Sequence, residues 1–222
     1  MPRIIPDYKN RSADSIVSER IHFESSGYVY RALSWLDFSK RKDSSVAFQY
    51  AAHDARQGIE QLLFEELVLS VGTNLDRAEY EKCLGNSTKL HAIINRLAPE
   101  REKLATFNWA IFSVGNVQMP LVVWDHKRLM KYWGKISNYL HWAGAIDETI
   151  QNESWTGEGI KVTEEACLYI WNNQTQNETG VMLPHDMHPE IRHLWKRYQA
   201  GSIGVEEVKI SVQLLEPTIS NA

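Results

Sequence analysis

Cysteine is scarce in this chain of 222 residues, which contains only Cys83 and Cys167. The two lie far apart in the sequence, and neither belongs to a CxxC pair. Structural zinc sites are usually built from such pairs, and small disulfide-held domains need several cysteines. The scarcity therefore excludes a disulfide framework and a zinc knuckle, and it predicts two reduced, buried thiols.

Long apolar runs are also missing. No stretch approaches the roughly 20 apolar residues that a helix needs to cross a bilayer. The start, MPRIIPDYKNRS, lacks the apolar core of a signal peptide. We therefore expect a cytoplasmic protein with no membrane partner. Its hydrophobic fraction of 43% is sufficient to build a core.

Positive charge is not in excess, because 24 lysines and arginines stand against 28 aspartates and glutamates, a net charge of −4 at pH 7. Non-specific binding of nucleic acid depends on clustered cations. The balance excludes a general nucleic-acid coat protein but leaves a local basic patch open. The chain also lacks the GxGxxG, P-loop, GxSxG and HExxH motifs. We therefore expect no cofactor.

The spacing of apolar residues predicts two long amphipathic helices, over residues 45–71 and 120–149. Asp43 or Ser44 is suited to cap the first helix, and Gly72 to end it. Pro120 suits the first turn of the second helix. The core stripe of the first helix consists of Phe48, Ala52, Ala55, Ile59, Leu62 and Leu63. We expect the two helices to pack antiparallel through their Ala and Leu stripes.

The other segments predict shorter elements. Ser-rich pieces and two early prolines indicate an irregular arm over residues 1–30, before a short helix from Tyr28 to Phe38. The sequence EREKLATFNWAIF predicts another helix, QNESWTGEG a linker or loop, and residues 163–173 a further helix. Two short helices are expected near the end, one with Pro189 in its first turn and one over residues 205–215.

No sustained period-two alternation occurs, so we expect an all-α fold: an antiparallel helical bundle with a short helical C-terminal appendage. The expected organisation has three parts. These are an N-terminal arm and short helix over 1–43, a helical bundle over 44–175 and a C-terminal helical hairpin over 186–222.

The helix predicted over residues 120–149 carries a polar stripe in which His141 is the candidate proton donor or acceptor. The pKa of an unperturbed imidazole lies close to neutrality. Ser137 and Asn138 precede His141 by one turn and could fix its tautomer, while Lys135 lies about 120° away around the helix. A cation, an amide and an imidazole together suit phosphodiester chemistry. A merely solvated helix face has the same appearance.

Three stretches in this order, AAHDARQGIEQLLFEELV, KLHAII and SNYLH, resemble the HEPN family of helical bundles, which includes many prokaryotic toxin and defence ribonucleases. The resemblance covers residues 44–150. It implies an active motif of an arginine and a polar residue followed by a histidine. His141 matches the histidine, and Lys135 stands at the arginine position. Ile136 stands where the polar residue would lie, so Ser137 or Asn138 must replace it.

Two functions follow from the resemblance. The first is a metal-independent endoribonuclease in which His141 is general acid or base on a ribose 2′-hydroxyl, Lys135 stabilises the pentacovalent phosphate and Asn138 or Ser137 orients groups. The implied partners are RNA, a second copy in a homodimer and an antitoxin or other partner protein. The second is an inactive module that binds a nucleotide or a partner protein. The second is favoured by Lys135, because lysine lacks the planar fork of arginine.

The stretch YQAGSIGVEE near the end resembles the turn of short paired-helix modules of the SHOCT type. The resemblance implies oligomerisation or docking of a partner. Just before it, His185, Asp186, His188 and His193 are residue types that bind metals, but their spacing matches no zinc site. We predict that these four belong to a loop and a helix start, and we expect no metal site.

Overall fold

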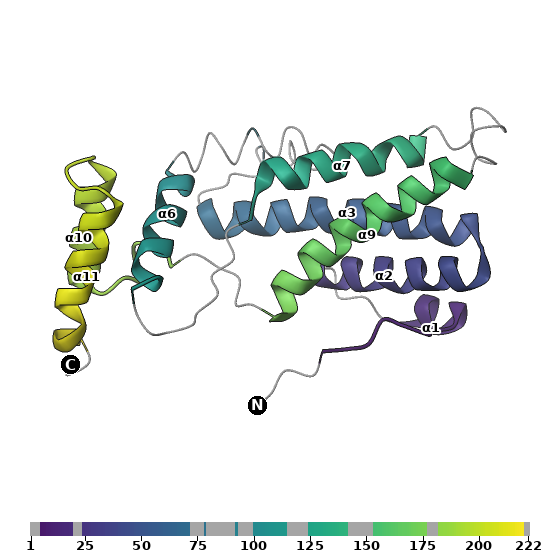
Figure 1. Ribbon diagram of the computed structural model, residues 1–222, viewed down its shortest axis with the longest axis horizontal. Helices are drawn as coiled ribbons and strands as arrows, with labels where there is room; N and C mark the ends of the chain where they lie inside the picture. Colours follow the sequence, from purple (N-terminus) through teal and green to yellow (C-terminus); the bar gives the residue numbers. More distant parts are fainter. Residues whose placement is uncertain are drawn as a thin grey trace. The chain divides into compact units, whose positions relative to one another are not determined.

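The computed structural model describes residues 5–19, 24–71, 78, 92, 100–114, 124–141, 153–176 and 182–219. Every regular element in these ranges is a helix, which confirms the all-α fold (Figure 1). No described helix has the length and hydropathy needed to cross a membrane. The chain forms two compact units, Met1–Ile93 with Trp124–Thr175 and Ile94–Val123 with Gln176–Ala222.

Two long antiparallel helices, α3 (Ser45–Val71) and α7 (His126–His141), organise the first unit. Its other helices are α1 (Ala13–Ser18), α2 (Ser25–Lys42) and α9 (Glu153–Gln176). α3 has the predicted bounds. Ser44 Oγ accepts a hydrogen bond from the Ala47 backbone N at 3.3 Å, which confirms Ser44 as the cap. Ala51, Ala52 and Ala55 are buried and allow neighbouring helices to approach α3 closely.

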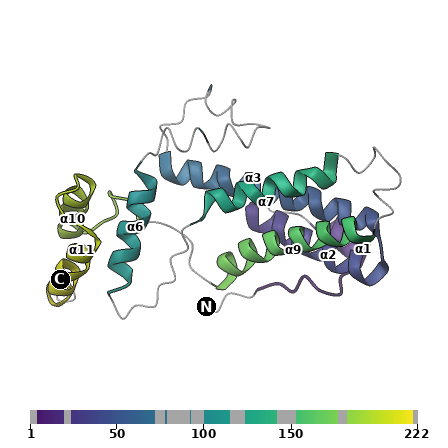
Figure 2. The same ribbon diagram turned by 45° about the horizontal axis from the view of Figure 1, so that its top comes forward.

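α7 packs antiparallel on α3, as predicted (Figures 1 and 2). Trp133 Nε1 donates to Glu60 Oε1 at 2.7 Å, while the ring of Tyr139, nearer the end of α7, lies 6.0 Å from that of Phe48, nearer the start of α3. The predicted start of this helix needs correction. Trp124 and Asp125 are not helical, and Asp125 Oδ1 accepts from the Arg128 N at 3.0 Å as an N-terminal cap. Pro120 and residues 142–150 lie outside the described ranges.

α9 is longer than predicted, because the expected loop QNESWTGEG forms its first turns from Glu153 onward. Gly159 explains the misleading composition of this stretch. A Cβ at Gly159 would lie 2.6 Å from Phe48 Cζ and 2.9 Å from Tyr139 Cδ1. The glycine therefore permits close packing of α9 against the aromatic rings of α3 and α7, and it does not mark a loop.

Replacing Gly159 with alanine should destabilise the chain by about 1–3 kcal/mol, because an added methyl group would overpack the contact with Phe48 and Tyr139. Gly157 is the matched control on the same helix, since a Cβ added there would meet no atom within 4 Å. Gly157→Ala should stabilise by about 0.5–1 kcal/mol, as alanine does in helices. Urea unfolding of both variants measures the difference. Equal effects of the two substitutions would contradict this packing role.

The N-terminal segment is more ordered than predicted. α1 begins after Ser12, whose side chain accepts from the Ser15 N, and α2 is longer than the expected helix from Tyr28 to Phe38. Arg11 donates to Ser34 Oγ at 3.1 Å and lies 4.9 Å from the centre of the Tyr30 ring. These contacts attach the segment before α1 to the outer face of α2. Short hydrogen-bonded segments of this kind carry no apolar periodicity, which is why the pattern suggested an irregular arm.

A buried ion pair joins α2 to α3. The Arg31 guanidinium donates from Nε and Nη2 to the two carboxylate oxygens of Asp54. The Asp54 side chain is 5% exposed and that of Arg31 is 26% exposed. Cys167 of α9 is buried, as predicted for a reduced thiol, and burial raises its pKa strongly. Cys83 lies outside the described residues.

The second unit contains α6 (Arg101–Phe112), α10 (Pro189–Gln199) and α11 (Val205–Ile219). Pro189 occupies the first turn of α10, as predicted. α6 groups here with the C-terminal helices, whereas its residues fall within the range 44–175 expected for the bundle. The reason is its buried face: the Phe107 ring lies 5.3 Å from that of Trp195. The core consists of Leu104, Phe107, Ala110, Met187, Ile191, Leu194, Trp195, Ile203, Val208 and Val212.

α10 and α11 form a tight helical pair. Gly201 has a φ of +72°, a conformation that favours glycine, and the Gly204 N donates to Glu207 Oε2 at the start of α11. His185, Asp186 and His188 lie before α10, and His193 lies on it. The oligomerisation or docking implied by the SHOCT resemblance stays a prediction.

Candidate functional site

The exposed face of α7 is cationic. Leu129 and Ile136 are fully buried against the rest of the first unit. The exposed side chains of the helix are Lys127, Arg128, Lys131, Lys135 and Asn138. Residues 126–141 contain no aspartate or glutamate. Four cations are therefore concentrated on one helix face, although the chain as a whole has a net charge of −4.

The lysines of this face have no acidic partner among the residues that the structure describes. In the described part of the chain, no carboxylate forms an ion pair with Lys127, Lys131 or Lys135. Successive members lie one turn apart, about 6 Å along the axis. Cations in a row produce a local positive potential that attracts an extended polyanion. This is the local basic patch that the overall composition left open.

The residues of the predicted catalytic group occupy different environments. Lys135 and Asn138 are exposed on the cationic face. Ser137 is buried and donates its hydroxyl proton to the Trp133 carbonyl at 2.8 Å, which favours Asn138 as the orienting group. The backbone of His141 ends α7, and its side chain lies outside what the structure describes. Lys135 and Asn138 are thus placed on one accessible face.

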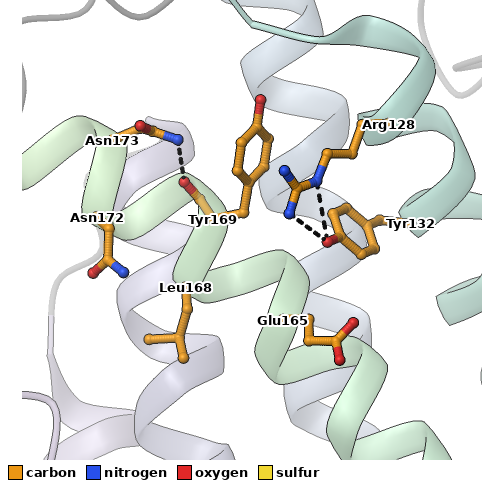
Figure 3. A pocket seen from close by; sticks show the side chains of 7 residues that line it. All are labelled: Arg128, Tyr132, Glu165, Leu168, Tyr169, Asn172 and Asn173. Carbon is orange, nitrogen blue, oxygen red and sulfur yellow. Dashed lines mark hydrogen bonds between the residues drawn. The ribbon is translucent and has the colours of Figure 1, made fainter. Parts of the chain in front are cut away.

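A cavity of about 440 Å³ lies between α7 and α9 (Figure 3). It is lined by Arg128, Tyr132, Glu165, Leu168, Tyr169, Asn172 and Asn173. The five residues from α9 follow the helical spacing of three and four and therefore occupy one face. The two residues from α7 are likewise one turn apart. The volume is sufficient for a small ligand, and the cavity is open to solvent rather than enclosed.

Arg128 is held over the cavity by two tyrosines. Its Nε and Nη2 donate to Tyr132 Oη at 3.2 and 3.0 Å, and its guanidinium carbon lies 4.1 Å from the centre of the Tyr169 ring. The hydrogen bond to Tyr132 raises the pKa of Arg128. Within the described ranges, no carboxylate forms an ion pair with Arg128. The group is therefore a preorganised cation, and the nearby charge of Asp125 also acts on it electrostatically.

Tyr169 is fixed by contacts of its own. Its Oη accepts from the Asp125 N at 3.4 Å, and the Trp124 ring lies edge-on at 5.7 Å. Asn173 Nδ2 donates to the Tyr169 carbonyl at 2.7 Å, one turn earlier on α9. The sequence analysis did not identify this cavity. In the sequence, the pair Arg128 and Tyr132 on one helix was the only indication of it. The other lining residues belong to α9, which is far from α7 in the sequence.

Further charged groups connect α3 and α7. Arg56 Nε donates to Glu60 Oε1 at 3.1 Å, and the same oxygen accepts from Trp133. The Arg56 guanidinium lies 4.9 Å from the centre of the Trp133 ring. This arrangement holds the middle of α7 on α3. Among the residues that the structure describes, no group of three or more His, Cys, Asp or Glu is arranged to hold a metal ion.

In comparisons with family models, curated proteins and solved structures, nothing matches the chain.

Proposed function

We propose that this protein binds single-stranded RNA along α7 and cleaves it without a metal ion. The observation that supports the proposal is the exposed row of cations on α7, unopposed by any acid of that helix. Lysines at one-turn intervals suit the repeated phosphates of an extended strand. RNA is favoured over DNA because its 2′-hydroxyl is a built-in nucleophile that a neutral imidazole can activate.

The proposed reaction is an internal phosphoryl transfer. His141 would remove the proton of the 2′-hydroxyl while its oxygen forms a bond to phosphorus and the bond from phosphorus to the 5′-oxygen breaks. Lys135 would stabilise the charge that develops on the phosphate, and Asn138 would orient it. The products are a 2′,3′-cyclic phosphate and a 5′-hydroxyl. The leaving 5′-oxygen also needs a proton.

A homodimer would supply this second proton. One imidazole cannot act as base on one oxygen and acid on the other within a single step, so the His141 of a second copy is the proposed acid. The HEPN resemblance extends the proposal to a cytoplasmic toxin or defence ribonuclease that a partner protein holds inactive.

Charge removal on α7 tests the binding step. The double variant Lys131→Gln with Lys135→Gln should bind single-stranded RNA about tenfold more weakly at moderate salt, because two phosphate contacts are lost. Lys9→Gln with Lys42→Gln is the matched control: both lysines are exposed on the same unit, away from α7, and the charge changes equally. Fluorescence anisotropy with a labelled RNA measures both. An equal loss in the two variants would contradict a site on α7.

The alternative is an inactive module that binds a nucleotide or a partner protein. It is favoured by the lysine at position 135 and by the cavity beside Arg128, which offers a binding site for a small ligand. RNA binding without cleavage in the presence of a chelator would support this alternative.

A further inference from the structure

We propose that the cavity between α7 and α9 binds a small phosphomonoester, with Arg128 as its anchor. Arg128 lies 13 positions before His141, which corresponds to about 20 Å along the helix. The cavity is therefore distant from the residues proposed for RNA cleavage, whereas its anchor Arg128 also belongs to the cationic face proposed to bind the RNA backbone. The anion is assigned from the direction and number of the hydrogen-bond donors around Arg128 (Figure 3).

Some hydrogen-bond donors of the Arg128 guanidinium have no acceptor among the described residues. Tyr132 accepts from Nε and Nη2, and no described residue accepts from Nη1. An arginine normally offers five N–H groups to a carboxylate or phosphate. Here the side chain is fixed by two aromatic rings, so little conformational entropy remains to be lost when an oxyanion binds.

Two hydroxyl groups add to this cation. Tyr132 Oη accepts from Arg128, and Tyr169 Oη accepts from the Asp125 N. Each hydroxyl therefore retains its own proton for donation. A guanidinium and two phenols then offer three donors from different directions. A tetrahedral phosphate with three terminal oxygens uses such an arrangement more fully than a planar carboxylate does.

The rest of the cavity indicates that the phosphate belongs to a larger polar molecule. The volume of about 440 Å³ exceeds what one phosphate needs. Glu165 lies one turn before Tyr169, where its carboxylate can accept from a hydroxyl or amine of the ligand. Leu168 offers an apolar surface, and Asn172 offers both a donor and an acceptor. A sugar phosphate or a nucleoside monophosphate has these features.

Isothermal titration of the full chain tests the site with four probes: adenosine 5′-monophosphate, glucose 6-phosphate, inorganic phosphate and adenosine. We expect one phosphomonoester at least to bind, and adenosine to bind at least about tenfold more weakly than its monophosphate. The preference between the two esters distinguishes a nucleotide from a sugar phosphate. Absence of binding by both esters at millimolar concentration would overturn the proposal.

Variants locate the binding. Arg128→Gln should weaken phosphomonoester binding at least about tenfold, and Tyr169→Phe, which removes one hydroxyl and keeps the ring, should weaken it several-fold. Lys42→Gln removes an exposed cation elsewhere on the unit and should have no effect. Circular dichroism checks that each variant is folded. If Arg128→Gln does not fold, Tyr132→Phe provides the second test of the same site. A loss as large in Lys131→Gln as in Arg128→Gln would overturn the proposal, since it would place the anion on the open face of α7.

Discussion

Replacing His141 with alanine should lower metal-free RNA cleavage by at least about 100-fold while the chain remains folded. The reason is that a positioned acid or base contributes this much to a proton-transfer step, whereas removal of a solvated side chain changes stability by no more than about 0.5 kcal/mol. Cleavage of an end-labelled RNA in the presence of a chelator, followed on a denaturing gel, measures the rate. Circular dichroism confirms folding.

Two further variants sharpen this prediction. His53→Ala removes an imidazole from α3 that is 63% exposed, and it should leave the rate unchanged. Lys135→Arg should raise the rate of a slow nuclease, because the planar guanidinium can hold two phosphate oxygens at once. Cleavage that survives His141→Ala, or that needs a divalent metal, would contradict the assignment.

The largest expected loss of stability follows from Asp54→Asn. The substitution keeps the shape of the side chain but leaves the largely buried Arg31 guanidinium without its counter-charge. Removal of one member of a buried ion pair costs about 3–5 kcal/mol, and the partial exposure of Arg31 places this case near the lower value. Urea unfolding monitored by circular dichroism measures the change.

The control replaces both members of the pair. Arg31→Met with Asp54→Leu removes both charges and should recover most of the stability, because apolar side chains of similar size pack well in such positions. A loss in the double variant as large as in Asp54→Asn would show that the polar contacts themselves, and not the unpaired charge, determine stability.

The long helices could be predicted because their signals are local. The apolar stripe of α3 and the cap at Ser44 lie within one continuous stretch, and the predicted bounds agree with the structure. Pro189 marked the start of α10 in the same way. The antiparallel packing of α7 on α3 also followed, since both stripes need a partner to bury them.

The predictions from the sequence were wrong or incomplete where a residue packs against one that is far away in the sequence. From the sequence alone Gly159 suggests a loop, whereas in the structure it lies in a helix and makes room for the Phe48 ring. α6 was placed with the long helices because the sequence does not show that Phe107 packs with Trp195. The cavity was missed for the same reason: Arg128 and Tyr169 meet only when α7 and α9 pack together.

The salt dependence of RNA affinity tests the central claim, that α7 binds an RNA backbone through its exposed cations. Each phosphate neutralised on a single strand contributes about −0.7 to the slope of log affinity against log salt concentration. Four cations on one face therefore predict a slope of about −3 for the wild-type chain. Affinity that does not change with salt, or no binding at low ionic strength, would contradict the account.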